Sequence, residues 1–319
     1  MEPTPTSSLK KRAEGEFVVP NYGSSSSLDS MSSSQTRPRR ELGRVASVRR
    51  YLAAEVDGSQ VNPPLSAYAF MTGYIDAISF STIFVWVGFQ TGNFTQLALS
   101  FARTIEAYLW GPPESAVFFV QHPPVATRLM PPAEQLAACS IFSFVLGTFL
   151  FGRIGDRIGT HKRGWLVFGT LFQALLTLAS AITFRLLEQE PSIPPTIASL
   201  NPLTTVSLKY FFGIACLSMS LGVQGIMARR LATAFSTTIV LTAIFVELTA
   251  NPALFQFSRS SPARDQQWLA AIFLFIGASV ARLILGQVGV ASTLAVAVLF
   301  RVAIAFSWLF IPARHIHLP

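Results

Sequence analysis

Charged residues are scarce in this chain. Asp, Glu, Lys and Arg make up 13% of its 319 residues, about half the share of a soluble domain. Mean hydropathy is +0.47, and seven long stretches carry no charge at all: 77–102, 135–152, 164–184, 210–228, 231–246, 266–281 and 283–300. A bilayer requires runs of about 18 apolar residues. The scarcity of charge therefore excludes a soluble fold and predicts an all-α polytopic integral membrane protein.

Cysteine and histidine are also rare. The two cysteines, Cys139 and Cys216, both fall in apolar runs, which argues against a disulfide or metal framework. Two of the four histidines, His315 and His317, read as a solvated pair near the C-terminus. Walker, H-E-x-x-H and G-x-S-x-G motifs are missing, so the sequence offers no enzymatic signature. We expect no metal, no cofactor and no catalytic residues.

The net charge of +8 is better explained by membrane topology than by nucleic-acid binding, because the positive residues cluster beside apolar runs. About six transmembrane helices are predicted, near 65–89, 134–152, 164–187, 206–228, 267–287 and 292–311. With the N-terminus inside, the inner segments near the membrane hold fifteen Lys and Arg residues and the outer segments three. Both termini should therefore be cytoplasmic, in the plasma membrane or an endomembrane.

Three regions follow from this division. Residues 1–64 form a Ser/Arg-rich cytoplasmic arm, predicted to be disordered because it holds too few apolar residues to bury. Its basic cluster, from Arg37 to Arg50, anchors the first span on the cytoplasmic side and could also bind anionic lipid. Residues 65–311 form the six-span domain in the lipid bilayer, and 312–319 form a cytoplasmic tail.

The membrane domain is predicted to be duplicated. Gly73-Tyr-Ile-Asp-Ala and the later Thr91–Leu97 have weak counterparts in Gly222-Val-Gln-Gly-Ile and Thr242–Leu248. The first repeat would cover 65–200 and the second 201–311. Three spans per repeat give a 3+3 inverted repeat, an architecture of many secondary transporters. The stretches 93–110 and 231–251 are expected to be re-entrant or interfacial, although either could cross the membrane.

The same residues resemble a known family. Gly73-Tyr-Ile-Asp-Ala followed by Thr91-Gly-Asn is similar to the GYxDA…TGN signature of the YoaK-like family, membrane proteins of bacteria and fungi with a domain of unknown function. Leu221-Gly-Val-Gln-Gly and Thr237–Thr242 resemble its second signature, with departures at Gly225 and Ala243. The resemblance implies a polytopic membrane protein without an established substrate, and the Ser-rich arm looks like a fungal elaboration.

The loop 152–163 resembles the cytoplasmic motif of major facilitator transporters. Its matching positions are Gly152, Asp156, Arg157, Gly159, Lys162 and Arg163. The alternative is a generic glycine-rich basic loop. Because a facilitator has twelve spans, six spans would be half of one, which suggests a possible homodimer.

Ionisable residues inside apolar spans are the sharpest candidates for function, because burying a charge in a membrane is costly. Asp76 and Glu247 are expected to meet at the repeat interface, with Arg301 as their counter-charge. Thr91, Gly92 and Asn93 suggest a helix break. Further polar residues near the repeated segments complete the predicted solute or ion pathway: Gln96, Gln224 and Thr242. Alternatively, these groups only form interhelical hydrogen bonds.

These features favour a transporter or permease for a small polar or anionic solute. A non-transporting membrane organiser or regulatory subunit is the alternative, and a lipid-modifying enzyme is a distant third. The sequence names no solute.

Overall fold

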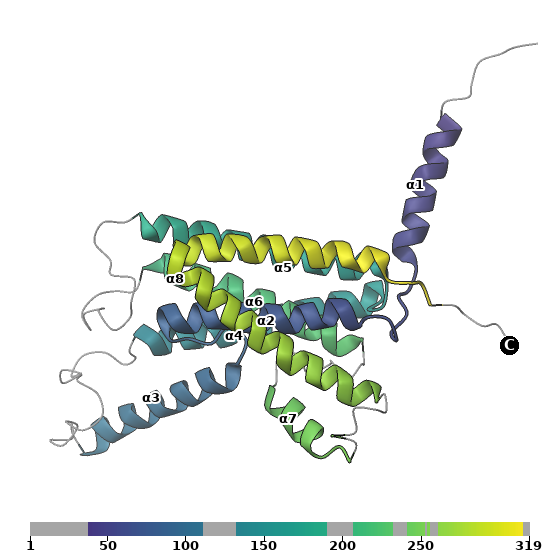
Figure 1. Ribbon diagram of the computed structural model, residues 1–319. Coiled ribbons are helices and arrows are strands. Elements are labelled where there is room, and N and C mark those ends of the chain that lie inside the picture. Colours follow the sequence, from purple (N-terminus) through teal and green to yellow (C-terminus); the bar gives the residue numbers. More distant parts are fainter. Residues whose placement is uncertain are drawn as a thin grey trace, which may run out of the picture. The chain divides into compact units, whose positions relative to one another are not determined.

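The computed structural model describes residues 38–110, 132–189, 207–231, 241–252, 254–255 and 261–314. Most of the predicted arm and tail, at 1–37 and 315–319, lies outside them. The described residues form helices and two isolated β-bridges. The helices are α1 (Pro38–Ala53), α2 (Asn62–Ile83), α3 (Gln90–Trp110), α4 (Pro132–Ile158), α5 (Arg163–Glu188), α6 (Leu208–Arg230), α7 (Leu241–Thr249) and α8 (Pro262–Phe310) (Figure 1).

Local signals set several helix ends. α2 and α8 begin with prolines, where the missing N–H is not needed, and the Ser207 hydroxyl caps α6 by accepting from the Lys209 N–H at 3.4 Å. α2 stops where Phe84 adopts φ 55°, a left-handed conformation that is uncommon for bulky residues. The first predicted span, 65–89, is therefore too long: its helix ends at Ile83.

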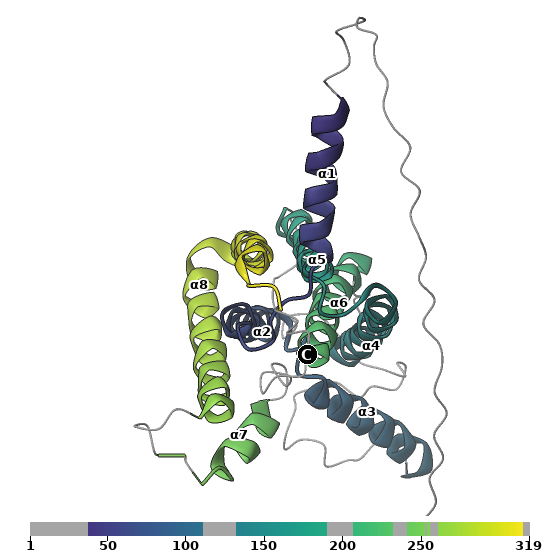
Figure 2. The same cartoon turned by 90° about the vertical axis from the view of Figure 1, so that its right-hand side faces the viewer.

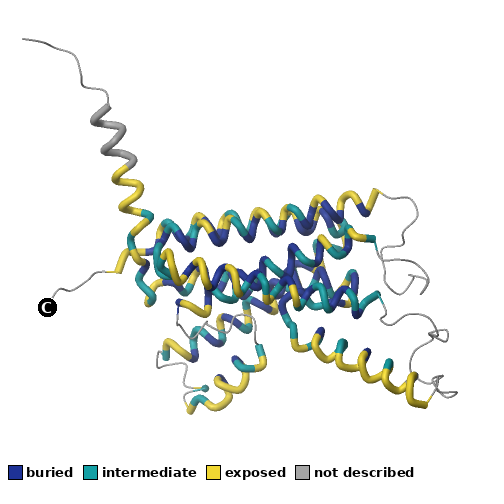
Figure 3. The backbone as a smooth tube through the Cα atoms, turned by 180° about the vertical axis from the view of Figure 1, so that it is seen from behind, coloured by how far each residue is buried: buried dark blue, intermediate teal, exposed yellow. Residues whose placement is uncertain are grey.

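Four described helices, α4, α5, α6 and α8, are long and apolar enough to cross a membrane. α8 contains the last two predicted spans, separated at Gly289, whose φ of 80° interrupts the helix. Many turns of the helices are exposed on one side and buried on the other (Figure 3). On α4, α5 and α8, several large apolar side chains are more than half exposed: Phe142, Phe149, Leu175, Ile182, Phe275, Leu283 and Leu299. A soluble monomer rarely exposes so much apolar surface, whereas lipid covers it at no cost.

The two halves of the chain are interleaved. α2 packs along α8, while α6 packs against α4 and α5, and α5 also packs along α8 (Figure 2). α2 and α6 are the inner helices: 67% of the apolar window of α6 is buried, against 22% for α8. Each inner helix therefore makes its main contacts with the other half of the chain.

Two close helix crossings use the same glycine pattern. A Cβ at Gly73 of α2 would overlap the Leu274 carbonyl of α8, and one at Gly277 would overlap the Phe70 carbonyl of α2. In the other crossing, Gly222 of α6 faces the Phe144 carbonyl of α4, and Gly147 faces the Met219 carbonyl. Glycine is required at these positions because the backbones touch.

Residues 54–57, 161–163 and 312–314 form what we call the β-bridge cluster. Glu55 pairs with Lys162, and Val56 pairs with Ala313. The Val56 N–H donates to the His161 carbonyl at 2.9 Å, and the Arg314 N–H donates to the Glu55 carbonyl at 2.9 Å. Within the predicted 1–64 arm, residues 38–53 form α1 and residues 54–57 are held by backbone hydrogen bonds, which differs from the disorder expected there.

Candidate functional site

Arg301 lies in the part of α8 that follows Gly289, and its side chain is fully buried. Its Nη1 donates to Gln173 Oε1 of α5, and its Nη2 donates to Ser220 Oγ of α6 at 3.2 Å. Its Nε has no hydrogen-bond partner. The expected ion pair with Asp76 or Glu247 is not formed: within the described residues, Arg301 bonds only to neutral side chains.

Polar side chains from α2, α5 and α6 surround this arginine. Gln224 Nε2 donates to the Tyr68 carbonyl and to Thr72 Oγ1, both at 2.9 Å. The Tyr68 hydroxyl lies 2.6 Å from Thr170 Oγ1, one helical turn before Gln173. We call this group the Arg301 cluster; its members are all fully buried and comprise Tyr68, Thr72, Thr170, Gln173, Ser220, Gln224 and Arg301. It lies where four helices from both halves of the chain meet.

Asp76 occupies a different position, next to the break between α2 and α3. Its Oδ1 accepts hydrogen bonds from the N–H groups of Val87 and Gly88, both at 2.8 Å, and its Oδ2 is buried without a partner. A Cβ at Gly88 would lie 2.5 Å from that Oδ2. The carboxylate therefore holds the 84–89 segment against α2, and only glycine fits at position 88.

Asn93 holds the other side of the 84–89 segment. Its Oδ1 accepts from the Trp86 N–H at 3.2 Å, and its Nδ2 donates to the Trp86 carbonyl and to Ser140 Oγ, the latter at 3.1 Å. Ser140 lies 2.7 Å from Ser218 Oγ of α6. The helix break was predicted at 91–93, but it lies before Gln90. Asn93 stabilises the break from inside the first turn of α3.

Gly92 belongs to the same arrangement, whereas Thr91 does not. A Cβ at Gly92 would lie 2.8 Å from Trp86 Cδ1, so the glycine makes room for the indole ring. The ring itself stacks on Phe80, with centroids 4.1 Å apart. Thr91 is exposed, and its carbonyl accepts from Thr95 Oγ1 at 3.0 Å.

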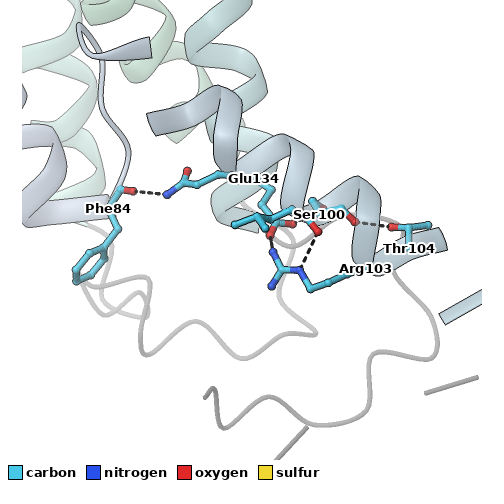
Figure 4. Close-up of polar contacts among 7 residues, drawn as sticks. Phe84, Ser100, Arg103, Thr104 and Glu134 are labelled. Atoms are coloured by element: carbon cyan, nitrogen blue, oxygen red, sulfur yellow. Dashed lines mark hydrogen bonds and ion pairs between the residues drawn. The ribbon is translucent and has the colours of Figure 1, made fainter. Parts of the chain in front are cut away.

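α3 leaves the bundle obliquely but is fixed to α4 (Figure 1). Glu134 of α4 accepts from Ser100 Oγ at 2.6 Å and forms an ion pair with Arg103 (Figure 4). Gln96 Nε2 reaches the Phe84 carbonyl at 3.5 Å, while its Oε1 is buried without a partner. Gln96 therefore belongs with the helix break and not with the Arg301 cluster.

Glu247 and Thr242 lie apart from both groups. Both residues are exposed on α7, and Glu247 Oε2 accepts from Gln267 Nε2 of α8 at 2.8 Å. The prediction that Glu247 meets Asp76 is therefore wrong for this conformation: Asp76 accepts from the segment between α2 and α3, whereas Glu247 accepts from α8. Most of the residues between α6 and α7, at 232–240, lie outside the described ones.

The facilitator-like loop closes one end of the bundle. Gly159 permits the turn with φ of 109°, and Asp156 pairs with Arg230 of α6, the ionised atoms lying 2.7 Å apart. Arg163 is buried, and it donates to the carbonyls of Tyr51 and Ile311 at 2.9 and 2.6 Å. Three further positions have packing roles or are solvent-facing: Gly152 beside Ile226, Lys162 over Gly159, and exposed Arg157.

Several residues of these groups were not singled out in the sequence. Tyr68, Thr170, Gln173 and Ser220 contribute to the Arg301 cluster, and Ser140 to the helix break. Their only signal in sequence was a polar side chain within an otherwise apolar span. Isolated Ser and Thr residues are common in membrane helices, where their hydroxyls bond to the preceding turn. Their convergence therefore depends on how the helices pack.

The helical bundle with its apolar exterior and buried polar groups defines an integral, multi-pass membrane protein of the all-α class. Residues 65–307 match the family described as "Protein of unknown function (DUF1275)", so the chain belongs to this family. The predicted family resemblance is thereby confirmed. The searches of curated proteins and of solved structures gave no match.

Proposed function

We propose that the protein is a secondary transporter or permease for a small polar or anionic solute. The observation that supports this most directly is the Arg301 cluster, a charged group buried among polar side chains where α2, α5, α6 and α8 meet. Ionisable groups inside a membrane domain are costly and usually serve a pathway. Covalent chemistry is not part of the proposal.

An inverted 3+3 repeat would account for the position of this cluster. Gly222 follows Gly73 by 149 residues, and Met219 follows Phe70 by the same interval. In the partner helices, Gly277 follows Gly147 by 130 residues, and the two left-handed glycines, Gly159 and Gly289, share that interval. These matched positions pair α2 with α6, α4 with the segment before Gly289, and α5 with the segment after it. Transporters of this architecture bind solutes at the repeat interface.

The proposed topology places both termini and the β-bridge cluster on the cytoplasmic side. Arg163 and Arg314 lie in that cluster, and the Arg230–Asp156 pair lies at the same turn between α4 and α5. This concentration of positive charge at one end supports the orientation. α2 would then cross the membrane, and α3 and α7 would not.

Two partners complete the proposal. Arg50 lines an open groove with Ser47 and Phe310, which suits an anionic lipid head group beside the membrane surface. A homodimer would give the twelve spans of the facilitators that the 152–163 loop resembles. Cross-linking in native membranes should yield a twofold species if this is correct.

A flux measurement tests transport. The full chain is reconstituted into liposomes, and swelling is followed by light scattering in sodium formate, acetate, nitrate, urea and glycerol. We expect at least one solute to enter faster than into empty liposomes. Gly73→Leu, which wedges the α2–α8 crossing, should slow that entry, whereas Gly286→Leu, at a position with no atom within 4 Å, should not. Entry at the background rate for every solute, with folded protein present, would favour a membrane organiser.

A further inference from the structure

Within the described part of the chain, no carboxylate contacts the guanidinium of Arg301. Six acids of the described helices engage other groups, and none of them bonds to this arginine: Asp76, Glu134, Asp156, Glu188, Glu247 and Asp265. A buried charge without a partner costs several kcal/mol. An arginine in the middle of a membrane helix therefore needs negative charge from outside the described side chains.

The same side chain also has unused hydrogen-bond donors. A guanidinium carries five N–H groups in a planar fork, and only two of them are used, by Gln173 and Ser220. Nε is buried and has no partner. Gln173 and Ser220 come from different helices, so they fix the plane of the fork and leave its remaining donors available. This is the arrangement that binds planar anions through two parallel hydrogen bonds.

We infer that the Arg301 cluster binds one small monovalent anion, a carboxylate or an inorganic oxyanion of similar size, and this rests on the proposed transport function for its biological use. One charge matches one uncompensated guanidinium. The surrounding groups are neutral, and the remaining N–H donors of the guanidinium itself can serve both oxygens of such an anion. Because all members of the cluster are fully buried, the bound anion is enclosed between the helices and must be small.

The anion also explains why the cluster sits at a helix junction. Arg301 belongs to α8, Gln173 to α5 and Ser220 to α6. An anion bound to the fork adds attraction at the point where these helices meet. Its release leaves an unpaired charge there, which weakens the junction and favours separation of the helices. Binding and helix packing are thereby coupled through one side chain.

The test uses the full chain in lipid nanodiscs, with thermal unfolding followed by tryptophan fluorescence. Sodium formate, acetate, nitrate and bicarbonate are titrated at constant ionic strength against gluconate, a much larger carboxylate. We expect a saturable rise in melting temperature with at least one small anion, because a ligand that binds only the native state stabilises it. Arg301→Gln should abolish the rise, and Arg282→Gln, which changes an exposed arginine of the same helix, should retain it.

Two results would overturn the inference: no response of the wild type to any of the four anions, or an unchanged response in Arg301→Gln. If Arg301→Gln does not fold, Arg301→Lys is used in its place. A lysine lacks the planar fork, so this variant should raise the half-saturating anion concentration at least tenfold. An unchanged half-saturating concentration would overturn the inference. Flux separates this site from the proposed function. Anion binding without flux would refute transport alone, whereas flux without any melting-temperature response to these anions would refute the anion site alone.

Discussion

Two buried arginines, Arg163 and Arg301, differ in how the fold treats their charge. Arg163 is 2% exposed and lies at the end of the bundle. Its Nη atoms donate to two backbone carbonyls, and its Cζ lies 4.0 Å above the centroid of the Tyr51 ring. Arg301 is 0% exposed, lies in mid-helix, and donates to two neutral side chains. The Nε atom of each arginine is buried without a partner.

If the proposed anion site is correct, the difference separates a structural charge from one that serves binding. Carbonyl oxygens and an aromatic face stabilise a cation well, so Arg163 ties α1, α5 and the segment after α8 together. Arg301 is stabilised less by its surroundings, because its acceptors are one side-chain amide and one hydroxyl. A buried charge that destabilises the fold is expected to serve a function, and the proposed anion would supply the missing negative charge.

The largest effect is expected at Arg163. Arg163→Gln removes two charge-assisted hydrogen bonds, each worth about 1.5–3 kcal/mol, together with the contact to Tyr51. We expect the free energy of unfolding to fall by about 3 kcal/mol, measured by thermal unfolding in nanodiscs. Arg163→Lys should recover little of this loss, since an ammonium cannot span both carbonyls. A stability equal to wild type would show that the β-bridge cluster does not depend on this side chain.

The two glycine crossings should be nearly equivalent. Gly73→Ala and Gly222→Ala each force a methyl group into a neighbouring backbone, and overpacking of this kind costs about 1–3 kcal/mol. Gly286→Ala serves as the matched control, because open space surrounds that position. Equal losses at the two crossings would support the inverted repeat. A loss at one crossing only would mean that the two are not equivalent.

Asp76 offers a way to separate the helix break from the Arg301 cluster. Asp76→Ala leaves the N–H groups of Val87 and Gly88 unpaired, which costs about 1–2 kcal/mol. Asp76→Asn keeps an acceptor for them, so its stability should stay near wild type. If the carboxylate takes part in proton coupling, Asp76→Asn should also remove the pH dependence of solute flux. Unaltered pH dependence in that variant would exclude the proton role.

The smallest effect is expected for the exposed pair of Arg230 and Asp156. Exposed ion pairs contribute about 0–1 kcal/mol, and both side chains are 45% exposed. Asp156→Asn should change the free energy of unfolding by about 0.5 kcal/mol or less, with a double-mutant cycle on Arg230→Gln as the measurement. A coupling free energy several times larger between Asp156 and Arg230 would show that this loop stabilises the fold about as much as Arg163 does.

The sequence predicted the class of fold because apolar runs and the positions of basic residues are local signals. The last two spans and the break between them were predicted near Gly289, and the turn between α4 and α5 was also placed correctly. The partners of the ionisable groups were not. Asp76 was expected to meet Arg301, yet it accepts from the amides of Val87 and Gly88. The sequence indicated a helix break at 91–93, but not that the N–H groups freed just before it would engage Asp76, because that contact depends on how the 84–89 segment folds back on α2.

The most direct test compares Arg163→Gln and Arg301→Gln in one experiment, by thermal unfolding in nanodiscs with and without formate, acetate, nitrate or bicarbonate. The account predicts opposite outcomes. Arg163→Gln should lose stability and keep its rise in melting temperature with the anion, whereas Arg301→Gln should stay within about 1 kcal/mol of wild-type stability, because it removes an uncompensated charge, and should lose the rise. If Arg301→Gln unfolds as readily as Arg163→Gln and still responds to the anion, Arg301 is a structural residue and the distinction between the two arginines is wrong.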